Sequence, residues 1–170
     1  MIDSGGSCES MKKLLSDINF EPDYILLTHG HIDHILSLPV FTTTNSKIFI
    51  HQADAHFLKD PSYNLSVSLT GQQFIFKSQV FDYKELPKEL GIRVIHTPGH
   101  TPGSVCFMVQ GHLFSGDTLF CGSIGNTIFP GGDYQTEITS VRNLLTLPLD
   151  TVVHPGHGCS TTIENEQNTI

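Results

Sequence analysis

The chain has 170 residues, of which 38% are hydrophobic and 15% charged, and its formal net charge at pH 7 is −8. This length allows one domain with a substantial core, so we expect a single domain over residues 1–170. The acidic balance argues against non-specific binding to nucleic acid or to an anionic membrane surface. No apolar run approaches the ~18 residues that a membrane-spanning helix needs.

Four cysteines are scattered along the chain without the Cys-x-x-Cys spacing of metal or redox motifs: Cys8, Cys106, Cys121 and Cys159. The first residues do not resemble a secretory signal peptide. Cysteine usage of this kind favours a reducing, cytoplasmic setting without a disulfide framework.

The first half of the chain is predicted to alternate between helices and short strands. Residues 7–17 carry Met11, Leu14 and Leu15 at helical spacing and predict an amphipathic helix with Ser7 as its N-cap. The elements expected after it are a strand at 23–28, a short helix at 35–41, a strand at 47–51, a short helix at 52–58, a loop at 60–73 and a strand at 74–81.

The second half is predicted to be richer in strands. Strands are expected at 92–97, 105–109 and 113–115, the last two forming a hairpin around Gln110-Gly111. A glycine-rich stretch at 121–133 leads into a predicted helix at 134–147. A last strand is expected at 150–153, and the polar tail from Thr161 is expected to be peripheral.

One loop is unusually dense in potential metal ligands. The apolar run 24–27 predicts a buried strand, and it leads into Thr28-His29-Gly30-His31-Ile32-Asp33-His34. Imidazole and carboxylate both suit zinc, iron or manganese. Three histidines this close would repel one another if charged, and a bound metal removes that conflict. The loop therefore predicts a metal site that needs further ligands from elsewhere.

Later strands also end in turns that carry candidate ligands. His100, Asp117 and His157 each follow a predicted strand, as His29 and His31 do. Strand ends that gather at one edge of a layered α/β domain are common places for a site. We expect sheets covered by helices.

Four sequence strings resemble the metallo-β-lactamase superfamily, and within it the short hydrolases that are similar to glyoxalase II (hydroxyacylglutathione hydrolase). These strings are 28–34, Thr97-Pro-Gly-His-Thr-Pro-Gly-Ser104, Ser115-Gly-Asp-Thr-Leu-Phe120 and Pro155-Gly-His-Gly158. The resemblance implies an α/β fold, a four-layer αββα sandwich. It also implies two divalent metal ions, with zinc preferred and iron or manganese as alternatives.

The resemblance assigns a role to each candidate ligand. It implies that His29, His31 and His100 hold one metal, that Asp33, His34 and His157 hold the other, and that Asp117 bridges them. Asp3 would orient the metal-binding loop without binding a metal itself. Asn126 stands where relatives carry a basic residue that grips glutathione, so it is the candidate substrate-binding residue.

The implied reaction is hydrolysis of a thioester such as S-lactoylglutathione by a hydroxide that bridges the metals, with Asp33 and Asp117 as the catalytic carboxylates. A thiol has a pKa near ~8.5 and leaves readily as a thiolate. An amide nitrogen needs a proton, for which Asp33 is the one clear donor. The expected partner is a small thioester, with no nucleic acid and no membrane.

The family pattern is incomplete at the N-terminus. Related enzymes usually have two or three strands before the position of Asp3, and here only Met1 and Ile2 precede it. A sheet without its first strands has an open edge, so we expect lower stability or a homodimer, with reduced activity as a further consequence.

Three other functions remain open. A persulfide dioxygenase of the same superfamily would use one iron held by two histidines and a carboxylate. β-Lactamase activity is disfavoured, because well-known lactamases of this fold have cysteine where this chain has Asp117. The third is a truncated metal-binding domain without activity. The remaining histidines are expected to be structural or at the surface, and Cys121 is not expected to act as a nucleophile.

Overall fold

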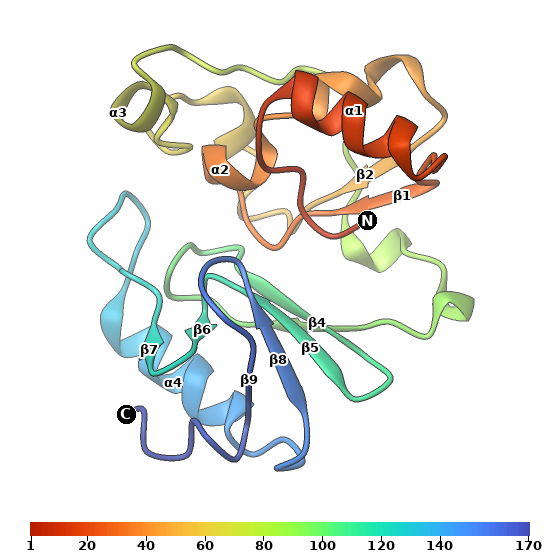
Figure 1. The fold of residues 1–170 in the computed structure, drawn as a ribbon. Coiled ribbons are helices and arrows are strands. Elements are labelled where there is room, and N and C mark those ends of the chain that lie inside the picture. Colours follow the sequence, from red (N-terminus) through yellow and green to blue (C-terminus); the bar gives the residue numbers. More distant parts are fainter. The chain divides into compact units, whose positions relative to one another are not determined.

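The computed structural model describes residues 1–170, and these fall into two units, Met1–Leu86 and Pro87–Ile170 (Figure 1). Each unit has its own buried cluster of hydrophobic side chains. The expectation of a single domain over residues 1–170 stays a prediction.

The first unit is built on a parallel pair of short strands. β1 (Tyr24–Leu26) pairs with β2 (Lys47–Phe49), with Ile25 opposite Ile48. Both isoleucines are buried, as expected for strands in an apolar run. Ile2 adds a single parallel bridge to Leu26 on the other side.

The first helix, α1 (Cys8–Asp17), confirms the prediction for this segment. Ser7 is the N-cap and its hydroxyl accepts a hydrogen bond from the Ser10 amide at 3.1 Å. Met11 is buried and Leu15 packs against the same hydrophobic cluster. The remaining helices of this unit are α2 (Ile32–Ile35), η1 (Leu38–Thr43), η2 (Phe57–Lys59), α3 (Ser66–Thr70) and η3 (Tyr83–Glu85), where η denotes a 3₁₀ helix.

Residues 52–86 differ most from expectation. The predicted loop at 60–73 contains α3, the predicted helix at 52–58 is mostly turns before η2, and the predicted strand at 74–81 forms only one bridge, from Phe81 to Phe49. The reason lies in side-chain hydrogen bonds. Asn64 donates to the Phe74 carbonyl, and the Ser66 hydroxyl accepts from the Phe74 amide. These buried side chains occupy backbone groups that a strand would offer to a neighbour.

The second unit contains a five-stranded sheet in the order β3-β4-β5-β8-β9 (Figure 1). β5 and β8 are parallel and the other neighbouring pairs are antiparallel. The strands are β3 (Arg93–His96), β4 (Val105–Val109), β5 (His112–Gly116), β8 (Val152–Pro155) and β9 (Thr161–Thr162), and η4 (Lys88–Leu90) precedes them. The β4–β5 hairpin around Gln110-Gly111 was predicted and is confirmed.

Helix α4 (Tyr134–Leu144) covers one face of this sheet. Its Val141 and Leu144 are buried in one cluster with Leu113 and Val153 of the sheet. A small hairpin of β6 (Leu119–Phe120) and β7 (Ser123–Ile124), which was not predicted, extends into the glycine-rich stretch at 121–133.

The C-terminal tail is not peripheral, and the prediction for it was wrong. β9 is an edge strand of the sheet, and Ile163 and Glu166 are buried. Glu166 is accommodated because its carboxylate accepts hydrogen bonds from the Thr161 hydroxyl at 2.7 Å and the Gly122 amide at 2.9 Å. None of the helices in the structure combines the length and apolar character that a membrane crossing requires.

Candidate metal centre

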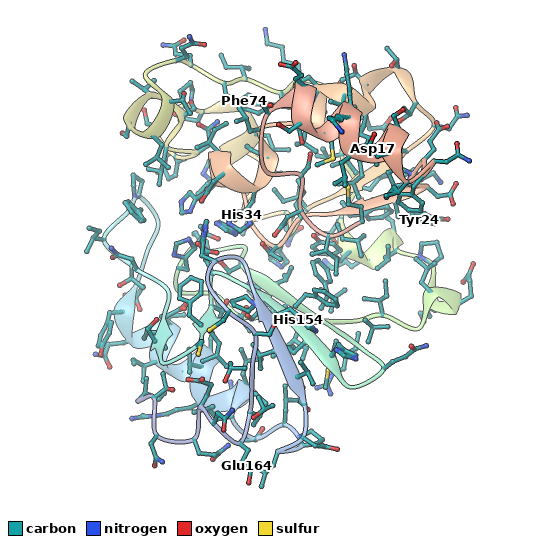
Figure 2. All side chains as sticks on the ribbon, viewed as in Figure 1. Asp17, Tyr24, His34, Phe74, His154 and Glu164 are labelled. Carbon is teal, nitrogen blue, oxygen red and sulfur yellow. The ribbon has the colours of Figure 1, made fainter.

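The histidine-rich loop of the first unit runs from the end of β1 into α2. The side chains of His29, His31 and His34 are buried, whereas the Asp33 side chain is 39% exposed. The ring of His29 lies 4.7 Å from that of His31 and 4.2 Å from that of His34, measured between centroids. Figure 2 shows His34 on α2. This crowding of imidazoles is unfavourable if they are protonated, so the loop favours their neutral forms.

Asp3 connects two of these histidines through one carboxylate. Its Oδ1 accepts from the Thr28 amide at 2.7 Å, and its Oδ2 accepts from the Thr28 hydroxyl at 2.8 Å and from His34 Nδ1 at 2.7 Å. Because the Thr28 hydroxyl donates to Asp3, it accepts from His29 Nδ1 at 3.1 Å. Asp3 therefore holds both rings with the proton on Nδ1 and the lone pair on Nε2, the tautomer that a metal binds.

Two groups hold the backbone of this loop close to its neighbours. A side chain at Gly30 would place its Cβ 2.4 Å from Cβ of Phe57, so only glycine fits there. The Gly30 amide donates to the buried Asp54 carboxylate at 3.2 Å. Asp54 was not among the predicted site residues, because an acid in a predicted short helix gives no sign of a backbone partner 24 residues earlier.

Tyr83 stabilises the strand that leads into the loop. Its hydroxyl lies within hydrogen-bond reach of the Leu27 carbonyl and, at 3.0 Å, of the Phe49 carbonyl. Burial, and next the negative charge of Asp3, raise the pKa of Tyr83 well above its usual value. The phenol therefore stays protonated at neutral pH and acts as a donor to these strand ends.

The second unit brings three predicted ligands together from three separate turns. His100 follows β3, Asp117 follows β5 and His157 follows β8. Oδ2 of Asp117 lies 3.8 Å from Nε2 of His100 and 3.6 Å from Nε2 of His157. These three residues are far apart in sequence, and the order of the strands in the sheet places them side by side.

The His100 turn is fixed by helix α4 and by the loop that precedes it. Glu137 Oε2 accepts from the His100 amide at 2.7 Å, and the Ser140 hydroxyl donates to the Pro98 carbonyl at 2.7 Å. Nδ1 of His100 lies 2.7 Å from the Asn126 carbonyl and must donate to it, which leaves the Nε2 lone pair for a ligand.

Gly99 is required in this turn. Its φ is +145°, and a Cβ there would lie 2.3 Å from Cα of Glu137 and 2.4 Å from its amide nitrogen. Turn and helix are therefore in direct backbone contact. Neither Glu137 nor Ser140 was among the predicted site residues, because polar residues of a helix usually face solvent.

Glu137 is an acid held in a low-dielectric position. Its side chain is fully buried, and this burial raises its pKa to about 8, with a smaller contribution in the same direction from the charge of Asp117. The amides of His100 and Gly125 lower it. In this geometry Glu137 accepts a hydrogen bond from the His100 amide and so orients the turn.

Asn126, the residue predicted to bind substrate, makes two contacts within the second unit. Its side-chain oxygen accepts from the Ile128 amide at 3.0 Å and closes a local turn, while its carbonyl orients His100. The prediction that Asn126 binds substrate stays a prediction.

His154, labelled in Figure 2, stacks on His112 with ring centroids 5.1 Å apart and forms a hydrogen bond with Ser160.

The donor set of each unit fits a metal of the zinc or iron class. Ligand atoms around one tetrahedral ion at ~2.1 Å lie roughly 3.4 Å apart. Within the first unit the His34 Nε2 to Asp33 Oδ2 distance is 3.8 Å, and the distances from Asp117 in the second unit are similar. Such pairs are too long for strong hydrogen bonds and suit a shared cation. Neutral imidazoles with oriented Nε2 atoms, together with carboxylates, are the ligands these metals use.

Residues 1–157 match the model of the family described as the metallo-β-lactamase superfamily. The chain belongs to this superfamily. Its members use a dinuclear metal site, in agreement with the clustering of candidate histidine and aspartate ligands in this chain. The α/β fold class predicted from the sequence is confirmed, and membership of a metallo-hydrolase superfamily supports the prediction of a hydrolase.

Three proteins illustrate the similarity. A hydroxyacylglutathione hydrolase, GloC of Haemophilus influenzae, is 32% identical over 98% of this chain and 83% of its own. The crystal structure of the B3 metallo-β-lactamase BLEG-1 has a TM-score of 0.89 and 39% identity, covering 98% of this chain and 84% of that one. The crystal structure of TTHA1623 in a di-iron-bound form has a TM-score of 0.89 and 34% identity, covering 99% and 86%.

Proposed function

We propose that this protein is a dinuclear metal-dependent hydrolase of thioesters, with S-lactoylglutathione as the representative substrate. The observation that carries the proposal is the hydrogen-bonded orientation of the ligand histidines, in which Asp3 and the Asn126 carbonyl leave Nε2 atoms ready for a cation. The identity with GloC supports the choice of thioester.

We further propose how the ligands divide between the two metals. One metal takes His29, His31 and His100, the other takes Asp33, His34 and His157, and Asp117 is shared. In this assignment the first unit supplies four ligands from one loop and the second unit supplies three from separate turns. Zinc fits this donor set, and iron also fits, as the di-iron form of a relative illustrates.

When bound, two such metals supply a hydroxide nucleophile at neutral pH and polarise the carbonyl that it attacks. The remaining tasks belong to side chains. Asp117 holds its charge next to His100 and His157, which keeps both imidazoles in place. Asp33, with its partly exposed carboxylate, can take and release a proton at its oxygen. A thiolate leaving group needs no proton from the protein, because thiol pKa values lie near ~8.5.

Turnover of S-lactoylglutathione by the metal-loaded chain, followed by release of the thiol, tests this proposal. The matched substrate is the oxygen ester of the same acyl group, whose alkoxide leaves much less readily. We expect thioester turnover to exceed ester turnover, and Asp117→Asn to abolish both. If the parent protein turned over the thioester and the ester at equal rates, the thioester assignment would be contradicted.

A second candidate, β-lactam hydrolysis, is favoured by one observation, the 39% identity with BLEG-1. A lactam nitrogen needs a proton as it leaves, and the candidate donor is Asp33. A chromogenic cephalosporin assayed on the same preparation distinguishes the two functions. Faster cephalosporin than thioester turnover, with selective loss in Asp33→Asn, would replace the thioester proposal by the lactam one.

A further inference from the structure

Two of the four cysteines lie together at the surface of the second unit. Cys121 and Cys159 are both free and exposed, whereas Cys106 is buried and Cys8 is half-buried. Cys121 is in the β6–β7 turn and Cys159 is in the connection from β8 to β9. Both line one cavity of about 290 Å³. The cavity is further lined by Phe120, Ser123, His157 and Gly158.

The two segments that carry these cysteines are tied together by Glu166. The Glu166 carboxylate accepts from the Gly122 amide, directly after Cys121, and from the Thr161 hydroxyl, two residues after Cys159. It also accepts from the Thr169 hydroxyl. A buried acid with three donors is held firmly, and it keeps the two turns at a fixed separation.

Within this frame the two cysteines face one cavity. The interaction with Cys159 is also the largest cause that raises the pKa of the Cys121 thiol. Two cysteines that line the same cavity can form a disulfide, with its ~2.05 Å S–S bond, once their side chains rotate toward each other. Both turns are exposed, so the rotation meets no packed core.

We propose that Cys121 and Cys159 form a dithiol modification site, which exchanges with low-molecular-weight disulfides and closes to an intramolecular disulfide. A cavity near the lower end of the ~300 Å³ range of small-molecule pockets admits such a ligand. His157, a proposed metal ligand, also lines this cavity, but neither cysteine belongs to the proposed ligand set, and the inference stands whether or not the protein hydrolyses thioesters.

The chemistry balances with the small disulfide as oxidant. One cysteine thiolate attacks a sulfur of the small disulfide, forms a mixed disulfide with the protein and releases one thiolate. The second cysteine, after losing its proton, attacks the protein sulfur of that mixed disulfide and expels the second thiolate. The two protons lost by the cysteines pass to the two released thiols. The protein is oxidised by two electrons and the small disulfide is reduced by two.

The other two cysteines do not compete. Cys106 lies between strands with its thiol against Thr97 and the Ser115 carbonyl, and burial raises its pKa to about 12. Cys8 lies on α1, in the first unit, with its thiol near the Leu36 carbonyl. Neither has a second thiol beside it, so neither is expected to form an internal disulfide.

The full chain, treated with glutathione disulfide under native conditions, provides the test. We expect the intact mass to fall by two hydrogens, two fewer thiols to be titrated by a thiol reagent, and the peptides of Cys121 and Cys159 to be joined in a non-reducing digest. Dithiothreitol should restore the original mass. Separate glutathione adducts on the two cysteines, a linkage to Cys106 or Cys8, or no reaction would each overturn the proposal.

Single variants sharpen this result. In Cys121→Ser the remaining Cys159 has no resolving thiol, so the mixed disulfide should accumulate and the mass should rise by one glutathione. Cys159→Ser should behave in the same way through Cys121. Cys106→Ser is the matched control and should still form the internal disulfide. If either pair variant still lost two hydrogens, the assignment to Cys121 and Cys159 would be wrong. Both positions are exposed, so the circular dichroism of the variants should match the parent chain.

Discussion

The two units carry candidate ligands in two different ways. In the first unit, four candidate ligands lie within residues 29–34, which run from the loop after β1 into α2. In the second unit, three ligands come from turns up to 57 residues apart, the separation of His100 and His157. The first set is local in sequence and is oriented by one carboxylate, Asp3. The second depends on the order of the strands and on α4.

This difference suggests how each set fails. Substitution of a residue that orients the loop 29–34 should weaken metal binding while the fold of the first unit persists. Substitution of a residue that positions the ligands of the second unit should disturb the contact between the His100 turn and α4, and should therefore lower stability as well. The following substitutions test this contrast, beginning with the largest expected effect.

Asp117→Asn removes the carboxylate that lies between His100 and His157. We expect the metal content to fall and turnover to drop by more than ~100-fold, because even residues that only orient ligands cost ~10–100-fold. Metal analysis and thioester hydrolysis measure this. The matched control is Asp150→Asn, an exposed acid of the same unit, which should change neither quantity. Activity retained above a tenth of the parent value would remove Asp117 from the proposed ligands.

Gly99→Ala should destabilise the second unit by about 3 kcal/mol, since it adds a Cβ against the α4 backbone to the strain of a positive φ. Gly111→Ala is the control: its φ is +81°, but nothing lies within 4 Å of the added Cβ. It should cost about 1 kcal/mol. Urea unfolding of the metal-free proteins measures both. Equal losses would show that the contact between the turn and α4 contributes little.

Asp3→Asn retains an oxygen for the Thr28 amide but replaces Oδ2 by an amide nitrogen, which cannot accept from the Thr28 hydroxyl or from His34 Nδ1. We expect metal affinity to fall by ~10–100-fold. Competition with a chelator measures the affinity. The control is Asp17→Asn, which affects only a surface pair with Lys13. A loss of stability as large as that of Gly99→Ala, without a loss of affinity, would reverse the contrast between the two units.

Ser140→Ala removes the hydrogen bond to the Pro98 carbonyl and has the smallest expected effect. Stability should fall by about 1 kcal/mol, the usual contribution of one such bond. Thr139→Ala, which removes a bond from an exposed hydroxyl to the Gln135 carbonyl on the same helix, is the control and should be close to neutral. Thermal unfolding compares the two. A neutral Ser140→Ala would mean that Glu137 alone fixes the turn.

The sequence predicted elements whose signals are local. The helix after Ser7 and the hairpin at Gln110-Gly111 were correct because a cap and a turn are encoded within a few residues. The predictions for segment 74–81 and for the C-terminal tail were wrong, because the hydrogen-bond partners of these segments lie elsewhere in the chain. Phe74 bonds to Asn64 and Ser66, and Glu166 bonds to Gly122.

The candidate ligands were identified from the sequence, because histidines and aspartates are distinctive residue types in segments that follow the ends of strands. The groups that orient them were harder to find. From the sequence, Glu137 resembles a solvent-exposed acid in the first turn of a helix. Its hydrogen-bond partner is a backbone amide 37 residues earlier. The Asn126 carbonyl leaves no side-chain signature at all. Asp3 was found only through the family resemblance.

The most direct test of the central claim is metal analysis of the purified protein, combined with S-lactoylglutathione hydrolysis on the same sample. The claim requires two metal ions per chain, and turnover that is lost when a chelator removes them and regained when zinc or iron is restored. A single iron per chain, with oxygen consumed on a glutathione persulfide and no thioester turnover, would contradict it.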